Sequence, residues 1–301
     1  MIFHKMHGTG NDYVFVDCIE ENPEIAGLEN ASLSDMARRI SDRHFGVGSD
    51  GLILILPSDA ADCRMRMFNS DGSEAEMCGN GVRCLAKYVR EKGLAHGDDI
   101  AVETGAGVLS LRAFVENGLV RSVRVDMGLP RLASDRIPVN VDTQGDVKTV
   151  RHLPKGFSIP PNVVIAHPLK VLDREFRITC VSMGNPHCVI FVDDARNFPL
   201  EKYGPAIETC EIFPKRTNVE FVTVANRGEV VQRTWERGAG ETLACGTGAG
   251  AVCVAAALNG LTGRKALVHL NGGDLKLEWS DDGHIYMTGP AEYVFRGEWH
   301  L

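Results

Sequence analysis

A short motif occurs twice in this chain, each time with a cysteine at the same place. The pattern Glu-x-x-x-Cys-Gly-x-Gly occupies residues 74–81 and again residues 241–248. Each copy follows a strand-like segment and a glycine-containing turn, and each leads into an apolar segment with helical spacing. A unit that is repeated in this way predicts two similar halves, each with one thiol at the start of a helix.

The similarity between the two copies extends to the N-terminal side of each cysteine. Asn69 and Glu236 both lie nine residues before their cysteine, each at the end of a strand-like segment. Further upstream, Asn11 and Asn185 each follow a glycine and precede a strand that ends in Phe-Val-Asp. The same order of elements in both halves favours duplication over chance. Two half-sites that face each other across a cleft are therefore expected.

The length of 301 residues suits two domains of about 150 residues, each able to bury its own core. The boundary is expected at Met127–Pro130, just after a predicted strand. The last strand, near Tyr293–Phe295, is expected to return to the first half. We therefore predict an N-terminal domain of residues 1–127 plus 290–301, carrying Cys78, and a C-terminal domain of residues 128–289, carrying Cys245.

Composition and charge restrict the class of partner. The net charge of −8 argues against a nucleic-acid or acidic-membrane partner, and favours a small-molecule substrate. The N-terminus lacks the apolar core of a signal peptide, and the longest apolar run, Ala249–Leu258, has about half the length needed to span a bilayer. Nine dispersed cysteines without a Cys-x-x-Cys pair fit a reducing cytoplasm and predict no metal site.

Three helices are predicted from the spacing of apolar residues. The first covers Ser32–Arg43, with Ser32 as its N-cap. The second follows Cys78 and ends at Gly93. The third follows Cys245 and is apolar on every side, so it is expected to be a central helix enclosed by strands.

Most other segments are predicted to be short strands, apart from an irregular excursion over Asp142–Leu169 that is rich in proline and turn residues. The predicted strands are Gly51–Leu56, Val108–Phe114, Arg121–Asp126, Phe176–Ser182, Ala266–Leu270, Leu275–Trp279 and Ile285–Thr288.

The two cysteine loops combine features suited to removing and returning a proton. A helix N-terminus or a nearby cation favours the thiolate form of a cysteine. The unpaired N–H groups at a helix start bind a carboxylate, and glycines let it approach the backbone. Two acid/base groups, one a thiolate and the other a thiol, on opposite sides of one carbon are what the inversion of a stereocentre requires. Such a pair titrates as a coupled unit.

Other interpretations of these loops have less support. Neither loop carries the Gly-Lys-Ser/Thr ending of a phosphate-binding P-loop, nor the complete Gly-x-Gly-x-x-Gly pattern of a dinucleotide site. A disulfide between Cys78 and Cys245 is interpreted as an oxidised artefact. Most of the other cysteines are interpreted as packing residues: Cys18, Cys63, Cys84, Cys180, Cys210 and Cys253.

Three further side chains are candidates for the site. His187 lies in Gly-Asn-Pro-His-Cys, a loop built like the first Gly-Asn loop, and can tune the ionisation of a nearby thiol. Glu236 can do the same by adding negative charge. Arg237, beside it, offers a donor fork suited to a second carboxylate. Taken singly, each of these residues also fits an ordinary loop or turn.

Four ordered stretches of this sequence together resemble the diaminopimelate epimerase family. The resemblance covers essentially the whole chain and rests on Lys5–Asp12, on Phe68–Glu74 with Cys78–Gly81, on Ser182–Cys188, and on Glu236–Thr242 with Ala244–Gly248. It implies a cytoplasmic homodimeric enzyme that uses neither pyridoxal phosphate nor any other cofactor. The implied reaction interconverts LL- and meso-2,6-diaminopimelate in the synthesis of lysine and peptidoglycan precursors.

The resemblance also implies a fold and a set of site residues. The implied fold is α+β, with two pseudosymmetric domains, each a curved, barrel-like mixed β-sheet wrapped around a central α-helix. Cys78 and Cys245 are implied as the acid/base pair, and His187 and Glu236 as the residues that adjust their pKa values. The implied substrate-binding residues are Gly79, Asn80, Gly246 and Thr247 at the helix starts, and Asn11, Asn69, Asn185, Asn218, Glu236 and Arg237 elsewhere.

Two positions depart from the family pattern. Gly51 stands where some members carry glutamine, so a side-chain contact with substrate from that position is not available. Thr247 replaces the serine of some members, and its backbone contact is expected to survive.

Three alternative functions remain open at the level of sequence. A proline or hydroxyproline racemase shares the two-cysteine arrangement and the fold, but Glu236, Arg237 and the four asparagines favour a substrate with a polar far end. A hydrolase with one nucleophilic cysteine would need only one of the two thiols. A binding protein without activity would never exchange the α-hydrogen of its ligand with solvent.

Overall fold

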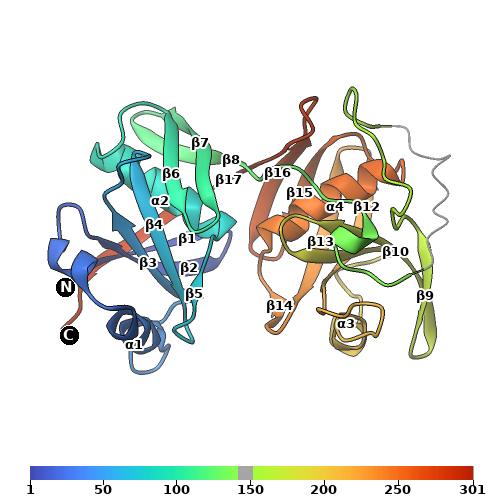
Figure 1. The fold of residues 1–301 in the computed structure, drawn as a ribbon, viewed down its shortest axis with the longest axis horizontal. Helices are drawn as coiled ribbons and strands as arrows, with labels where there is room; N and C mark the ends of the chain where they lie inside the picture. The colour runs from blue at the N-terminus through green and yellow to red at the C-terminus, as the bar shows by residue number, and fades with distance from the viewer. Residues whose placement is uncertain (142–151, 301) are drawn as a thin grey trace. The chain divides into compact units, whose positions relative to one another are not determined.

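The computed structural model describes residues 1–141 and 152–300, which form a mixed, sheet-rich α+β fold as predicted (Figure 1). The chain divides into two compact units. Unit 1 comprises Met1–Asp126 with Thr288–Leu301, and unit 2 comprises Met127–Met287. Among the described residues, no helix combines the length and hydropathy that a membrane span requires.

The sheet of unit 1 begins at the two ends of the chain. Strand β1 (Ile2–Gly8) pairs antiparallel with β18 (Glu292–Glu298) and with β2 (Asn11–Asp17), so the last strand joins the first half. Strand β2 runs parallel to β3 (Gly51–Leu56), and β3 pairs antiparallel with β4 (Cys63–Asn69).

The second part of this sheet follows the first cysteine loop. Strand β4 pairs antiparallel with the short β5 (Glu74–Ala75) and parallel with β6 (Asp99–Thr104). Strands β7 (Gly107–Glu116) and β8 (Leu119–Asp126) then add antiparallel pairs. The sheet combines parallel and antiparallel pairs, and strands β1 to β4 contribute apolar side chains to a buried core cluster that also includes residues of α1.

Two helices complete unit 1. Helix α2 (Gly79–Lys92) packs against β1, β2, β6, β7 and β8, and ends at Gly93, whose φ of 78° confirms the predicted glycine C-cap (Figure 1). Helix α1 (Asn30–Ser41) covers β3 and β4, and its apolar Leu33, Met36, Ala37 and Ile40 are buried. The prediction of Ser32 as its N-cap is wrong. The N-cap is Glu29, which has an extended backbone and directly precedes the helix. Ser32 therefore already lies in the first turn.

Unit 2 repeats this arrangement. Strand β10 (Arg174–Ser182) pairs antiparallel with β9 (His167–Val171) and β11 (Pro186–Phe191). Strand β11 runs parallel to β12 (Asn218–Asn226), which pairs antiparallel with β13 (Glu229–Glu236).

The remaining strands of unit 2 also follow the order of unit 1. Strand β13 pairs antiparallel with β14 (Gly240–Thr242) and parallel with β15 (Lys265–Leu270). Strand β16 (Gly273–Trp279) pairs antiparallel with β15, and β17 (Ile285–Gly289) follows. Strands β9 to β14 therefore correspond in pairing and direction to β18 and β1 to β5.

The central helix of unit 2, α4 (Gly246–Leu258), is buried along its whole length except at Thr247. It packs against β10, β11, β12, β15 and β16, which confirms the prediction of a helix enclosed by strands (Figure 1). Helix α3 (Leu200–Glu208) lies between β11 and β12 in sequence, as α1 lies between β2 and β3. Two short 3₁₀ helices, Pro23–Gly27 and Ser134–Arg136, complete the described elements.

The predicted strands are present, with ends that differ by up to three residues. The excursion predicted over Asp142–Leu169 is only partly described, because residues 142–151 lie outside the described residues. Residues 152–166 form no named strand or helix. The predicted end of the excursion is wrong, because β9 begins at His167.

Candidate active site

Each duplicated cysteine is the N-cap residue of the central helix of its unit. Cys78 has φ −135° and ψ 120°, and its sulfur accepts a hydrogen bond from the N–H of Gly81 at 3.4 Å. Cys245 has φ −118° and ψ 108°, and its sulfur accepts from the N–H of Gly248 at 3.4 Å. Both sulfurs therefore lie at the positive end of a helix dipole, where a thiolate is stabilised.

An arginine–glutamate pair fixes the hairpin that precedes each cysteine. In unit 1, Arg66 Nε and Nη2 donate to the two carboxylate oxygens of Glu74 at 2.8 and 3.0 Å. In unit 2, Arg233 makes the same two bonds to Glu241, at 2.7 and 2.9 Å. Such bidentate pairs set orientation as well as distance. This geometry explains why both copies of the motif begin with glutamate.

Strand register defines equivalent positions in the two units. Tyr13 pairs with Gly51 across the parallel strands β2 and β3, and His187 pairs with Asn218 across β11 and β12. Tyr13 and His187 each lie two residues after the asparagine of a Gly-Asn pair. Tyr13 is therefore the counterpart of His187, and Gly51 is the counterpart of Asn218.

The sulfur of Cys78 contacts two side chains of β2. The hydroxyl oxygen of Tyr13 lies 3.3 Å from Cys78 Sγ, and Oδ1 of Asn11 lies 3.6 Å from it. Asn11 Oδ1 also accepts from the Tyr13 hydroxyl at 3.1 Å and from Asn80 Nδ2 at 3.2 Å. The structure thus brings together three of the predicted residues of this half, with Tyr13 as an addition.

Charged residues fix the side-chain amide of Asn11. Its Nδ2 donates to a carboxylate oxygen of Asp50, and Arg43 bonds the other oxygen of Asp50 at 3.0 Å. Arg43 also bonds Asp12 at 2.7 Å. Burial alone would raise the pKa of Asp12, but its hydrogen bonds with Arg43 and Lys5 lower it. With Nδ2 engaged, Asn11 directs its Oδ1 toward Cys78.

A buried cation lies on α2, one turn beyond Cys78. Arg83 is fully buried, and its guanidinium donates to the Gly79 carbonyl at 3.2 Å and to the Pro290 carbonyl at 3.1 Å. Burial lowers the pKa of Arg83, while the charges of Cys84 and Cys78 oppose this shift. The guanidinium of Arg83 therefore adds a positive charge near Cys78.

The other predicted residues of unit 1 lie at the ends of the same elements. Asn69 ends β4, where Gly51 pairs with it, and its Nδ2 donates to Ser73 Oγ at 2.9 Å within the turn. Gly79 is the first residue of α2. A Cβ at Gly51 would lie 2.2 Å from the carbonyl oxygen of Phe68, which leaves no room for a side chain at this backbone position.

The sulfur of Cys245 contacts a chain of polar side chains. Thr247 Oγ1 lies 3.5 Å from Cys245 Sγ and accepts from Asn185 Nδ2 at 3.3 Å. Asn185 Oδ1 lies 3.0 Å from Nε2 of His187, whose Nδ1 lies 2.7 Å from Glu220. Since Asn185 Oδ1 can only accept, Nε2 of His187 carries a hydrogen. The fully buried side chains of His187 and Glu220 are therefore joined directly through Nδ1.

These residues also form a possible ligand set for a metal ion. Ligand atoms of His187, Glu220 and Cys245 all lie within 4.8 Å of one another. Imidazole, carboxylate and thiolate are donors that Zn²⁺ accepts. However, both ring nitrogens of His187 already make hydrogen bonds, so metal binding would have to break one of them.

The two cysteines differ in the side chain that lies next to the first turn of their helix. A Cβ at Gly81 would meet the Ile53 methyl group at 2.6 Å, whereas a Cβ at the equivalent Gly248 would meet Oε1 of Glu220 at 2.7 Å. The first half thus has an apolar residue where the second half has a carboxyl group. Burial, and then the charges of Glu236 and Glu220, raise the pKa of the Cys245 thiol well above its ordinary value.

The loop after β13 carries the remaining predicted residues. Glu236 accepts from Thr242 Oγ1 at 2.6 Å. Asn218 is buried, donates to the Pro186 carbonyl at 2.9 Å and accepts from the Arg237 N–H at 2.9 Å. Arg237 is exposed, with Nη1 bonded to the Lys215 carbonyl at 3.0 Å. Asn218 therefore positions the Glu236–Arg237 loop.

Sequence reasoning missed Tyr13, Glu220 and the two arginines of the hairpin pairs. An aromatic residue in a strand is typical of a core, and Glu220 alternates with apolar residues as a surface position would. The repeat held the signal for Tyr13, because aligning the Gly-Asn pairs places it opposite His187.

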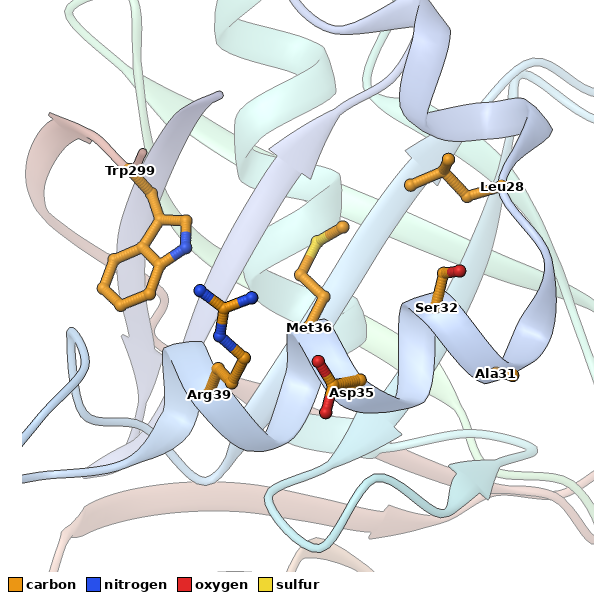
Figure 2. Close-up of a pocket in the computed structure, with 7 residues that line it drawn as sticks. All are labelled: Leu28, Ala31, Ser32, Asp35, Met36, Arg39 and Trp299. Atoms are coloured by element: carbon orange, nitrogen blue, oxygen red, sulfur yellow. The ribbon is translucent and has the colours of Figure 1, made fainter. Parts of the chain in front are cut away.

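Two cavities among the described residues lie away from the cysteines. Figure 2 shows a cavity of about 430 Å³ between α1 and Trp299, and none of its lining residues was predicted for the site. A second cavity, of about 730 Å³, is lined in part by Arg233, Glu241 and His269. Neither is lined by Cys78 or Cys245.

Comparison with known proteins agrees with the motifs. The chain matches the family described as diaminopimelate epimerase over residues 3–133 and 179–294. It is 52% identical to a diaminopimelate epimerase from Acetivibrio thermocellus, over 99% of this chain and 98% of the relative. It is 51% identical to one from Moorella thermoacetica, over the full length of both chains.

Solved structures show that the fold is shared more widely. A Bacillus anthracis phenazine biosynthesis protein of the PhzF family has a TM-score of 0.67 at 18% identity, covering 100% of this chain and 99% of that one. A probable proline racemase from Agrobacterium radiobacter has a TM-score of 0.66 at 15% identity, covering 100% and 93%. These likenesses concern the fold alone. The full-length sequence identity and the family match establish that this chain is a member of the diaminopimelate epimerase family of isomerases.

Proposed function

We propose that this chain interconverts LL- and meso-2,6-diaminopimelate, and so serves the synthesis of lysine and peptidoglycan precursors. The observation that carries this proposal is the duplicated cysteine at the N-cap of each central helix, in a chain about half identical to diaminopimelate epimerases. One sulfur would remove the α-proton as a base, and the other would deliver a proton to the opposite face as an acid. The scheme uses no cofactor and no metal.

The two cysteines start from different protonation states in this proposal. Cys245 is the resting acid, because burial and the carboxylates of Glu236 and Glu220 favour its protonated form. Cys78 is the resting base, because the helix dipole and the positive charge of Arg83 would favour its thiolate form. In the reverse direction the two roles are exchanged.

The helix starts are proposed to hold the reacting carboxylate. The N–H groups of Gly79 and Asn80, and of Gly246 and Thr247, belong to the first turns of α2 and α4, where backbone donors lack intrahelical partners. They would also stabilise the negative charge that develops on this group as the α-carbon is deprotonated. The rest of the substrate would be bound by Asn11, Asn69, Asn185, Glu236 and Arg237, with Asn218 acting by positioning the Glu236–Arg237 loop.

Incubation with LL-diaminopimelate in D₂O tests the reaction. We expect meso-diaminopimelate to form with one deuterium at the inverted α-carbon, because the acid that delivers the proton exchanges with solvent. The measurement is mass spectrometry of the product after separation of the stereoisomers, with boiled protein as control.

Proline is the substrate that distinguishes the proposed function from the main alternative. A proline or hydroxyproline racemase of the same fold would incorporate deuterium into proline and leave diaminopimelate unchanged. That outcome would contradict our proposal. Binding of diaminopimelate without exchange at the α-carbon would instead identify a binding protein.

We propose a cytoplasmic homodimer whose two units act as the domains predicted above. Three consecutive apolar side chains of β18 are exposed, Tyr293 by 43%, Val294 by 53% and Phe295 by 44%, and together they supply a surface that a second copy could cover. Most other cysteines are buried free thiols, which suits a reducing compartment.

The dimer is tested by sedimentation equilibrium. We expect twice the monomer mass of 32.8 kDa for the native chain, and a shift toward monomer for Phe295→Lys. Val108→Lys is a matched control, since Val108 is also an exposed apolar strand residue, on β7. A native chain that remains monomeric at high concentration would contradict the proposal.

A further inference from the structure

The structure assigns a catalytic role to Tyr13, which no motif identified: its hydroxyl is the hydrogen-bond donor that stabilises the thiolate of Cys78. This inference rests on the proposed function of Cys78 as a base. It concerns a group that touches the reacting sulfur, at 3.3 Å. Two acceptors lie within reach of this hydroxyl, and His187 occupies the equivalent position in the other unit.

The Tyr13 hydroxyl can alternate between two acceptors. In this structure its oxygen lies 3.1 Å from Asn11 Oδ1 and 3.3 Å from Cys78 Sγ. When Cys78 is a thiol, its S–H can donate to Asn11 Oδ1 or to the Tyr13 oxygen. When Cys78 is a thiolate, the sulfur can only accept, and rotation of the Tyr13 O–H toward it adds a charge-assisted hydrogen bond. Asn11 Oδ1 keeps its bond from Asn80 Nδ2 in both states.

Tyr13 remains a donor throughout the cycle. The side chain is only 4% exposed, and burial, followed by the negative charge of Cys78, raises its pKa well above the ordinary value of 10. Its O–H bond therefore stays intact while Cys78 gains and loses the substrate proton. The hydroxyl only rotates, so no proton leaves the residue.

The equivalent position in unit 2 supports this role. His187 occupies the place of Tyr13 by register and by its spacing from the Gly-Asn pair. His187 and the carboxyl group of Glu220 both lie near Cys245. Tyr13, by contrast, lies near Cys78 together with the apolar Ile53. A neutral donor on one side and an acid–imidazole pair on the other would favour a thiolate at the first cysteine and a thiol at the second.

Other charged and titratable groups also act on this part of unit 1. They are Asp50 before β3, and Arg83 and Cys84 on α2. Asp50 and Cys84 carry or can carry negative charge, which opposes a thiolate, and Arg83 favours one. None of them is altered when Tyr13 is replaced by phenylalanine, so this substitution isolates the hydroxyl.

The experiment compares Tyr13→Phe with Tyr88→Phe, each in the Cys245→Ala background. Tyr88 is 3% exposed and its hydroxyl bonds Asp17 at 3.0 Å and His4 at 3.2 Å, so the control also loses a buried hydroxyl. The rate of Cys78 alkylation by iodoacetamide is followed from pH 5 to 10 by peptide mass spectrometry. We expect Tyr13→Phe to move the midpoint up by about one pH unit, with alkylation roughly tenfold slower at neutral pH. Tyr88→Phe should leave the midpoint in place.

The same substitutions with Cys245 intact should change catalysis in the same sense. The acidic limb of kcat/KM should move to higher pH in Tyr13→Phe, because a less stabilised thiolate is lost to protonation at a higher pH. An unchanged midpoint in Tyr13→Phe, or an equal shift in both tyrosine variants, would overturn the inference. The proposed function fails by a separate result, namely full epimerase activity in Cys78→Ala.

Discussion

Replacing either duplicated cysteine by alanine is expected to lower kcat/KM for the epimerisation of LL-diaminopimelate by at least about 10³-fold, because each variant lacks one of the two groups that move the proton. The two losses should be far from additive in Cys78→Ala/Cys245→Ala, since the groups act as a unit. The measurement is the rate of meso-diaminopimelate formation, with circular dichroism to confirm that each variant is folded.

Hydrogen exchange gives this prediction a sharper form. A variant with one sulfur can still remove a proton from the face that the sulfur touches and return a deuteron there. Each single variant should therefore exchange the α-hydrogen of only one stereoisomer, without inversion, and the two variants should prefer opposite stereoisomers. Cys253→Ala, a fully buried cysteine within α4, is the control and should retain native activity. Native rates in either Cys78→Ala or Cys245→Ala would contradict the two-base scheme.

The second large effect is expected from a single methyl group at Gly248. Its Cβ in Gly248→Ala would lie 2.7 Å from Glu220 Oε1 and 3.2 Å from both Cys245 Sγ and Gln232 Nε2. All of these side chains are buried, so they can move only by breaking contacts. We expect the free energy of unfolding to fall by about 1–3 kcal/mol, as in other overpacked cores. Displacement of the sulfur should lower kcat by roughly 10²-fold.

Gly250→Ala is the matched control for this substitution. It adds the same methyl group to the same helix, but the nearest atoms, of Ile285 and Met183, lie at ordinary contact distances of 3.4 and 3.6 Å. Alanine is the better helix former by roughly 1 kcal/mol, so this control should be neutral or slightly stabilising. The free energy of unfolding from urea titrations and kcat are compared in both variants. Equal behaviour of the two variants would show that crowding behind Cys245 has no consequence.

Local patterns were enough to predict most of the fold. The all-apolar helix after Cys245, the glycine at the end of α2 and the alternating strands each follow from spacing alone. Helix α3 was missed because Gly204 and Pro205 lie within it, and both residues disfavour a helix interior. The repeat would have predicted α3, since α1 lies at the equivalent place in the first half.

Only part of the candidate site could be predicted from the sequence, and the reason is physical. Motifs identify residues that lie near each other in the chain, such as Cys78 with Gly79 and Asn80. Tyr13 and Glu220 meet their cysteines through strand pairing, 65 and 25 residues away in sequence. Register decides which side chains of a strand face the helix, and register is set by the folded sheet.

The arginine–glutamate pairs before the two cysteines have a consequence for how the protein reaches this structure. Each pair joins residues only eight positions apart, within one hairpin. Contacts of such short sequence separation form with little loss of chain entropy and early relative to distant pairings. The loops that present the sulfurs can therefore take shape as local elements in the nascent chain, before the carboxyl-terminal strand arrives to close the first sheet.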